Sequence, residues 1–371
     1  MNYHIAVISG DGIGPEITKQ SVKVLNAIGK VYGHKFSFEE GLMGAISIDK
    51  TGTPLPDETI KLCKTADAIL FGSIGHPKYD NDPTAKIRPE QGLLKLRKTL
   101  GLFCNVRPVK AYDCLLGKSP LKRSIIENTD ITIYRELTGG IYFGEKSISE
   151  DGNKAFDGCS YSVEEIERIA HLAFKDALNR RKKLTLVDKA NVLETSRLWR
   201  KTVDRISESY PEVLLEKLFV DNAAMQLILD PKQFDVILTE NLFGDIISDE
   251  ASVIGGSIGL LASASIGKEI GLFEPIHGSF PQAAGKNIAN PLASILSAAM
   301  LLDYLGLTTE SRCIEDVVDR SLNLGVSTVD INSDKPFSTD EVGDYIVNQI
   351  LNSNKPSREF ENIELGQSTI I

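Results

Sequence analysis

Asn241-Leu-Phe-Gly-Asp245-Ile-Ile-Ser-Asp249-Glu250 lies where a strand-like run ending at Thr239 gives way to a helix-like run. This stretch places Asp245 and Asp249 four residues apart, so both carboxylates share one face of the expected helix. Two interpretations stay open: the acids are screened by solvent, or they hold a divalent cation, which prefers oxygen ligands. Asp221, which follows another apolar run, is a third candidate ligand.

The chain around this stretch alternates between strand-like and helix-like runs, which predicts an α/β fold with a largely parallel sheet. Ser162 and Glu165 form an S-x-x-E capping box at one helix start, and Pro291 stands at the expected first position of another helix. Expected strands cover residues 5–8, 68–71, 131–134, 184–187, 215–220 and 236–238, and expected helices cover 15–30, 93–100, 163–179, 192–210 and 292–305.

The segment 139–160 interrupts this alternation. It carries five glycines among aromatic residues and has no helical period, which indicates a hairpin-like arm. Two antiparallel strands alone are marginally stable in water, so we expect the arm to pack against a partner surface, as in an oligomer.

Composition narrows the class of protein. The 371 residues suffice for two domains, and the formal charge of -10 disfavours nucleic acid or an anionic membrane as partner. The strand-like run at residues 5–8 leaves no room for a signal peptide before it, so we expect a cytoplasmic protein.

Five widely spaced cysteines indicate reduced thiols. The apolar run 254–266 is short and rich in Gly and Ser, as in a packed core segment, and the polar tail from Asn352 is expected to be loosely held.

Two glycine-containing loops are candidate nucleotide sites. Gly10-Asp-Gly-Ile-Gly14-Pro15-Glu16 lacks the G-x-G-x-x-G spacing, and Glu16 opposes phosphate at a helix start, so a plain strand-to-helix turn is the competing interpretation. The loop 273–291 gathers His, Gly, Ser, Lys and Asn residues, whose backbone N–H donors and imidazole suit an adenine nucleotide. For His277 alone a structural role stays open.

Cationic side chains complete the candidate set. Arg88, Arg97, Arg107 and Arg135 can bind carboxylates with two nitrogens each, or can be ordinary surface cations. Lys189 ends an expected strand, where ligands gather in open α/β sheets, so it is either a proton-transfer group or a solvated lysine.

Five motifs then stand in one order along nearly the whole chain: Gly10-Asp-Gly-Ile-Gly-Pro-Glu16, Arg135-Glu-Leu-Thr-Gly-Gly-Ile-Tyr-Phe-Gly144, Asp188-Lys-Ala-Asn-Val192, Asn241 to Asp249, and His277-Gly-Ser279 followed by Gly285-Lys-Asn-Ile-Ala-Asn-Pro291. Together they resemble the β-decarboxylating dehydrogenases, which act on isocitrate, isopropylmalate, homoisocitrate and tartrate. The segment 88–97 is similar to that of the members that use isopropylmalate.

The resemblance implies a two-domain fold that differs from a classical Rossmann fold. Residues 1–103 and 256–371 would form a larger cofactor-binding domain, and residues 104–255 a smaller domain for dimerisation, metal and substrate. The implied reaction is oxidative decarboxylation of (2R,3S)-3-isopropylmalate to 4-methyl-2-oxopentanoate and CO₂ with reduction of NAD, in leucine biosynthesis. The alternatives are a broader D-malate or tartrate oxidase, which needs a more polar pocket, and a non-catalytic regulatory partner.

The resemblance also implies roles for single residues in a homodimer whose sites are shared between subunits. Asp221, Asp245 and Asp249 would hold Mg²⁺ or Mn²⁺, and Tyr142 and Lys189 would be catalytic, with Asp221 and Lys189 coming from the other subunit. The implied substrate residues are Arg97, Arg107, Arg135, Asp221, Leu93, Leu94 and Val192. The implied cofactor residues are Ile13, Ser73, Ile74, Gly75, Glu90, Asn241, Glu274, His277, Gly278, Ser279, Gln282, Asn287 and Asn290.

One position departs from the family pattern. Gln282 stands where many NAD-using members carry an aspartate that repels the 2′-phosphate of NADP, and no cation replaces that acid here. We therefore expect NAD as cofactor, with weaker discrimination against NADP.

Overall fold

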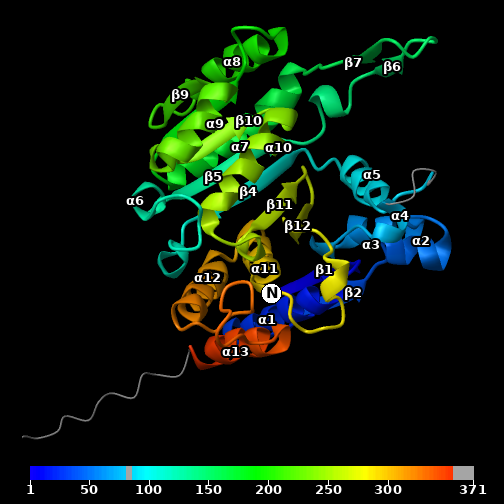
Figure 1. Ribbon diagram of the computed structural model, residues 1–371, viewed down its shortest axis with the longest axis vertical. Helices are drawn as coiled ribbons and strands as arrows, with labels where there is room; N and C mark the ends of the chain where they lie inside the picture. Colours follow the sequence, from blue (N-terminus) through cyan, green and yellow to red (C-terminus); the bar gives the residue numbers. More distant parts are fainter. Residues whose placement is uncertain (81–85, 354–371) are drawn as a thin grey trace, which may run out of the picture.

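A ten-stranded sheet forms the centre of the protein in the computed structural model, which describes residues 1–80 and 86–353 (Figure 1). The strands lie in the order β2-β1-β3-β12-β11-β4-β5-β10-β8-β9. Their bounds are β1 Asn2–Gly10, β2 Lys35–Glu40, β3 Ala68–Ser73, β4 Cys104–Lys110, β5 Asp130–Glu136, β8 Lys183–Asp188, β9 Leu214–Phe219, β10 Val236–Thr239, β11 Ala262–Ile266 and β12 Gly271–Pro275. Most of the tail from Asn352 lies outside the described residues.

The pairing is parallel toward both edges of the sheet and antiparallel at its centre. Strand β11 pairs antiparallel with β12 and with β4, and β4 pairs antiparallel with β5. The remaining neighbours are parallel. The predicted α/β fold with a mostly parallel sheet is therefore confirmed, and the antiparallel centre separates it from an all-parallel Rossmann sheet.

Both faces of the sheet are buried, because successive side chains of a strand point to opposite faces. In β1, Ile5 and Val7 join one apolar cluster whereas Ala6 and Ile8 join another. The helices cover these faces, with α1, α11, α12 and α13 grouped together at the lower end in Figure 1 and α7 to α10 at the upper end. Their bounds are α1 Gly14–Tyr32, α2 Ala45–Thr51, α3 Asp57–Thr65, α4 Pro77–Asp80, α5 Glu90–Leu100, α6 Arg123–Ile126, α7 Val163–Asn179, α8 Glu194–Ser207, α9 Val220–Leu229, α10 Asn241–Ser252, α11 Leu292–Tyr304, α12 Thr308–Asn323 and α13 Thr339–Asn352.

The predicted elements all occur, with small shifts at their ends. Helix α7 begins and ends where predicted, and Ser162 and Glu165 form the expected capping box. Pro291 precedes α11 as its N-cap residue, so its prediction as the first helical residue was wrong by one position. Strands β2, β4, β11 and β12 and helices α2, α3, α4, α6, α9, α12 and α13 were not predicted.

The arm after Gly139 is a hairpin, as predicted. Strands β6 Lys146–Ile148 and β7 Ala155–Asp157 pair antiparallel in a sheet of their own, and the hairpin projects from the body in Figure 1. Ile148 and Phe156 are 69% and 57% exposed, so two apolar side chains of the arm have no cover within this chain.

Two further expectations are confirmed. All five cysteines are free thiols. The run 254–266 contributes buried residues to the core, and β11 lies within it. Across the part of the chain that the structure describes, no helix is both long enough and apolar enough to cross a membrane.

Candidate functional site

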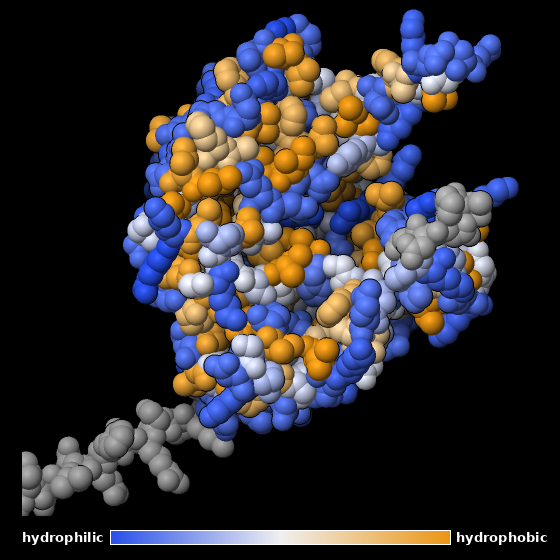
Figure 2. Space-filling view, viewed as in Figure 1, coloured by the Kyte–Doolittle hydropathy of each residue, from blue (hydrophilic) through white to orange (hydrophobic). Residues whose placement is uncertain are grey.

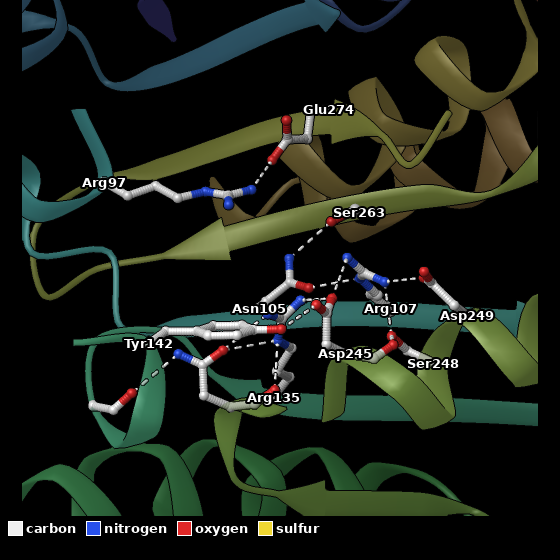
Figure 3. A network of polar contacts seen from close by, with 12 residues as sticks. Arg97, Asn105, Arg107, Arg135, Tyr142, Asp245, Ser248, Asp249, Ser263 and Glu274 are labelled. Atoms are coloured by element: carbon white, nitrogen blue, oxygen red, sulfur yellow. Dashed lines mark hydrogen bonds and ion pairs between the residues drawn. The ribbon is translucent and has the colours of Figure 1, made fainter. Parts of the chain in front are cut away.

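A network of arginines and acids lies beside the antiparallel centre of the sheet (Figure 3). Arg135, at the end of β5, is ion-paired with Asp245 on α10, and the Tyr142 hydroxyl donates to the same carboxylate at 2.8 Å. Arg107 on β4 donates to the Asp249 carboxylate at 2.8 Å and to the Ser248 hydroxyl at 2.7 Å. The structure thus brings together five predicted site residues.

Strand register and one glycine explain this meeting. Thr239 at the end of β10 pairs with Arg135 on the neighbouring strand, so α10 starts directly beside the guanidinium. Asn241 accepts hydrogen bonds from Arg135 through its side-chain and main-chain oxygens, and its amide donates to the Gly139 carbonyl. A Cβ at Gly244 would lie only 2.6 Å from the Arg135 side chain, so a larger residue there would displace it. Asn241, a predicted cofactor residue, is therefore buried and already bonded within the chain.

The environment of Arg135 disfavours its charged form. Burial and the nearby Arg107 and Arg97 together lower the pKa of Arg135 to about 10, against the opposing effect of Asp245. The pKa of Tyr142 is raised, first by burial and then by its hydrogen bond to Asp245. The tyrosine therefore keeps its proton near neutral pH and can act as a proton donor.

A second ion pair lies near this network, in the other half of the sheet. Arg97 on α5 donates to Glu274 on β12 at 2.6 Å, and the Glu274 side chain is only 9% exposed. A pocket of ≈ 180 Å³ lies between them and Arg107. Its lining also includes predicted substrate and cofactor residues, namely Ser73, Ile74, Leu93, His277 and Gly278. In the space-filling view the molecule is hollowed between the part with the β6-β7 arm and the part with α4 and α5 (Figure 2).

The predicted catalytic lysine stands apart from these groups. Lys189 follows β8 and donates to Asp221, at the start of α9, at 2.6 Å. This bond lowers the pKa of Asp221. Within residues 1–80 and 86–353, no hydrogen bond or ion pair joins Lys189 or Asp221 to Asp245, Asp249 or Tyr142.

The donor set on α10 fits a hard divalent cation. Asp245 and Asp249 lie one helical turn apart with side chains 35% and 69% exposed, so their oxygens are accessible. Magnesium commonly takes only one or two protein carboxylates and keeps waters or substrate oxygens as its other ligands. No third acid joins them, since the described residues contain no group of three or more metal-binding side chains.

The predicted cofactor segments are tied together by Asp11. Its carboxylate accepts backbone hydrogen bonds from Ala45, Ile46 and Gly75 at 2.8 to 3.0 Å, and its amide donates to the Ser73 carbonyl. Asp11 thereby joins the first glycine loop to the loop after β3 and to the start of α2. No predicted role had been given to this residue.

The first glycine loop is a packed turn. The Ile13 amide donates to the Ser279 carbonyl at 2.8 Å, and a Cβ at Gly12, whose φ is +59°, would overlap that carbonyl. Glu16 accepts the Gly285 amide, so its carboxylate fastens the later loop. The glycines thus serve close backbone packing, which favours the turn interpretation over a phosphate cradle.

Beside this turn lies a mostly apolar pocket of ≈ 470 Å³. Predicted residues Ile13, His277, Gly278 and Asn290 line it, and burial lowers the pKa of His277, which keeps the imidazole neutral. Gln282 is exposed and Asn287 accepts the Asp340 amide. Unpredicted lining residues outside the predicted loop 273–291 are Ile258, Gly259, Val329 and Asp330, whereas Phe280, Ile288 and Ala289 lie within that loop but were not predicted singly.

Asp330 shows why some of these escaped prediction. Its carboxylate accepts the Asn290 amide at 3.0 Å and the Ser257 hydroxyl at 2.9 Å, yet it lies 40 residues beyond the loop it contacts. No local motif surrounds it. Phe280 carried a possible signal, as an aromatic residue amid small and polar ones, but its φ of +37° is not readable from sequence.

Three predicted site residues remain to be located: Glu90, Leu94 and Val192. Glu90 begins α5, and its carboxylate lies 3.0 Å from where a Cβ of Gly75 would stand. Leu94 and Val192 are 52% and 62% exposed, and neither lines a described pocket with the arginines.

One surface of the molecule is unusually apolar. On α9, Met225, Ile228 and Leu229 are 45% to 57% exposed, and on the neighbouring α10 Ile246 is 57% exposed. Apolar side chains gather over this part of the molecule in Figure 2. Contiguous exposed apolar surface of this kind marks a protein interface.

Comparison with known proteins adds a family. Residues 4–346 match the isocitrate/isopropylmalate dehydrogenase family. The chain is 54% identical to a 3-isopropylmalate dehydrogenase of Bacteroides fragilis, covering 94% of this chain and 99% of that one, and 52% identical to a protein of the same name from Aquifex aeolicus, covering 94% and 97%. The crystal structure of isocitrate dehydrogenase from Methylococcus capsulatus superposes with a TM-score of 0.82 at 34% identity, covering 94% of this chain and 99% of that one.

Proposed function

The chain belongs to the isocitrate/isopropylmalate dehydrogenase family, and from that premise we propose that it is a cytoplasmic, NAD-dependent 3-isopropylmalate dehydrogenase of leucine biosynthesis. The observation that carries this proposal is the meeting of Arg107 and Arg135 with two accessible carboxylates and the Tyr142 hydroxyl in one network. Such a site can bind a dicarboxylate and a cation side by side.

In this proposal Arg97, Arg107 and Arg135 orient the two substrate carboxylates through paired hydrogen bonds. Leu93 supports a pocket for the isopropyl group, because it lines the cavity that also contains Arg97 and Arg107. Leu94 and Val192 are exposed in the single chain and would complete the apolar wall.

Asp245 and Asp249, with Asp221 of the second chain, would hold Mg²⁺ or Mn²⁺. When bound, the cation supplies Lewis acidity toward the substrate hydroxyl, and NAD accepts the hydride. Lys189 would take the hydroxyl proton, since its bond to Asp221 holds the amine in place. After CO₂ leaves, Tyr142 would give its proton to the carbon that lost the carboxylate.

The cofactor would lie along the segments that Asp11 joins. Ile13, His277 and Asn290 line the ≈ 470 Å³ pocket, whose apolar walls suit an adenine ring, and Ser73 and Ile74 line the adjoining pocket near the arginines. The shared lining of the two pockets by His277 and Gly278 supports a hydride acceptor beside the proposed substrate position.

We also propose a homodimer with shared sites. Three features support it: the apolar face of α9 and α10, the uncovered apolar side chains of the arm, and the separation of Lys189 and Asp221 from Tyr142 within one chain. The proposed division into residues 1–103 with 256–371 and residues 104–255 is supported by the apolar clusters, which fall almost entirely within one part or the other.

The proposed activity is tested by NADH formation from 3-isopropylmalate with and without a chelator. We expect activity that the chelator abolishes and added Mg²⁺ or Mn²⁺ restores. Faster oxidation of D-malate than of 3-isopropylmalate would contradict the substrate assignment.

Cofactor choice is a separate test. Gln282 is exposed and neutral, so it neither repels a 2′-phosphate nor pairs with it. We expect kcat/KM to be higher for NAD than for NADP, and Gln282→Asp to widen that ratio. A wild-type preference for NADP would contradict the assignment.

A further inference from the structure

Every arginine proposed to bind the substrate is ion-paired, in this chain, with a carboxylate proposed for a different ligand (Figure 3). Arg135 pairs with Asp245 and Arg107 pairs with Asp249, both proposed cation ligands. Arg97 pairs with Glu274, a proposed cofactor residue. The three cations and three anions therefore satisfy one another.

This pairing makes either ligand alone unfavourable. A substrate dicarboxylate that takes Arg107 and Arg135 leaves Asp245 and Asp249 without a cationic partner beside two new negative charges. A divalent cation that takes the two aspartates leaves two guanidinium groups unpaired beside two new positive charges. When both ligands enter together, the added charges cancel and every group has a partner.

We propose that these ion pairs hold the site in a self-paired state, and that cation and substrate bind cooperatively because each releases the partner that the other needs. The proposal rests on the proposed function, since it adopts those ligand assignments. By linkage, the substrate then raises the affinity for the cation by the same factor by which the cation raises the affinity for the substrate.

Burial decides how strongly the exchange is coupled. The Arg135 and Arg107 side chains are only 8% and 14% exposed, so neither can be hydrated fully when its aspartate leaves. A substrate carboxylate can replace the aspartate.

The pair of Arg107 with Asp249 is the better one to test. Asp249 is 69% exposed and is paired with Arg107, whereas Asp245 is paired with both Arg135 and Arg107 and also accepts the Tyr142 hydroxyl. The proposal predicts an outcome opposite to that of simple damage. Removing the Arg107 charge frees Asp249 and should strengthen cation binding in the absence of substrate.

The experiment measures Mn²⁺ binding by electron paramagnetic resonance of the free ion, for the full-length protein with and without 3-isopropylmalate. We expect the substrate to tighten Mn²⁺ binding to the wild type by about 10-fold or more. We expect Arg107→Gln to tighten Mn²⁺ binding without substrate by about 2- to 5-fold, and to weaken the effect of the substrate. Arg107→Lys, which keeps the charge, should stay close to the wild type.

Lys110→Gln is the matched control, because it also removes one cation from β4 and breaks an ion pair, of 2.8 Å with Asp319, outside the site. It should leave Mn²⁺ binding unchanged. If Arg107→Gln binds Mn²⁺ no better than the wild type while Asp249→Asn weakens binding, the self-paired site is overturned and the metal assignment stands. If Asp249→Asn binds Mn²⁺ as the wild type does, both fail.

Discussion

Tyr142 is a single residue whose hydroxyl faces the reacting region and keeps its proton. The hydroxyl donates to Asp245, and its pKa is raised by burial and by that bond. We predict that Tyr142→Phe lowers kcat by about 10²-fold or more, because it removes the proposed proton donor. The measurement is kcat with 3-isopropylmalate, alongside the melting temperature.

Tyr79→Phe is the control, since Tyr79 makes a similar bond of 2.7 Å to Asp49 away from the network. It should leave kcat unchanged. Equal kcat for Tyr142→Phe and the wild type would remove Tyr142 from the mechanism.

Glu240 belongs to a row of three buried acids behind the site. Glu136, Glu240 and Asp188 directly follow Arg135, Thr239 and Val187, which are paired in register on β5, β10 and β8. Arg168 pairs with the first acid and Arg200 with the last. Glu240 pairs with no cation in the described residues, and one of its oxygens has no hydrogen-bond partner.

The pKa of Glu240 lies above its ordinary value. Burial, followed by the charges of Asp188 and Glu136, raises its pKa from 4.5 to about 7. Tyr161 and Cys159 also face it. A raised pKa means that the folded protein binds the proton more tightly than the unfolded chain, so this stabilisation is complete below about pH 4.5 and is lost as pH rises through about 7.

Glu240→Gln lacks that titration. We predict that its free energy of unfolding, relative to that of the wild type, increases between about pH 4.5 and 7 by about 3 kcal/mol and is constant above. Denaturant unfolding at several pH values measures the difference. A difference independent of pH would show that Glu240 titrates normally.

At the residue scale, the sequence predicted which charged residues belong to the candidate site, but not which of them pair with one another. The arginines and aspartates were recognisable from motifs. Their mutual pairing depends on side-chain positions that no spacing encodes, as with Arg97 and Glu274, which lie 177 residues apart. Asp11 was likewise visible in a motif, but its acceptor role became evident only from the loops around it.

Among the elements, helix α9 carries the clearest sign of an uncovered surface. Ile228 is 45% exposed on the apolar face shared with α10. We predict that Ile228→Glu converts the dimer to a monomer at micromolar concentration and lowers activity, because a charge in an apolar interface is costly when buried. Analytical ultracentrifugation measures the oligomeric state, and NADH formation measures activity.

Leu324→Glu is the matched control, because Leu324 is 65% exposed just after α12, outside that face. It should leave the dimer intact. A wild-type protein that is monomeric while active would contradict the shared site.

Elements with a strong local signal were predicted well. Helix α7 has a capping box and a regular apolar face, which fix its ends. Strand β4 was missed because it contains the polar side chains of Asn105 and Arg107 and the restricted backbone of Pro108, which are unusual in a central strand. These residues are tolerated there because Asn105 and Arg107 bond to the site and to β11.

For the whole molecule, the decisive feature is that the proposed catalytic residues form two groups that do not contact each other within the described part of the chain. Tyr142, Asp245 and Asp249 form one network, while Lys189 and Asp221 form another pair that does not contact it in the described residues. The family resemblance predicted this separation as a consequence of sharing between subunits.

The direct test is complementation between two inactive variants. Lys189→Ala chains and Asp245→Asn chains are mixed, dissociated and reassociated, and NADH formation is measured. In a mixed dimer, one site receives the intact Asp245 from the first chain and the intact Lys189 from the second. The shared site predicts recovery of about one quarter of wild-type activity after random reassociation of equal amounts. Recovery of no activity, with mixed dimers present, would mean that each site is built from one chain and would contradict the account.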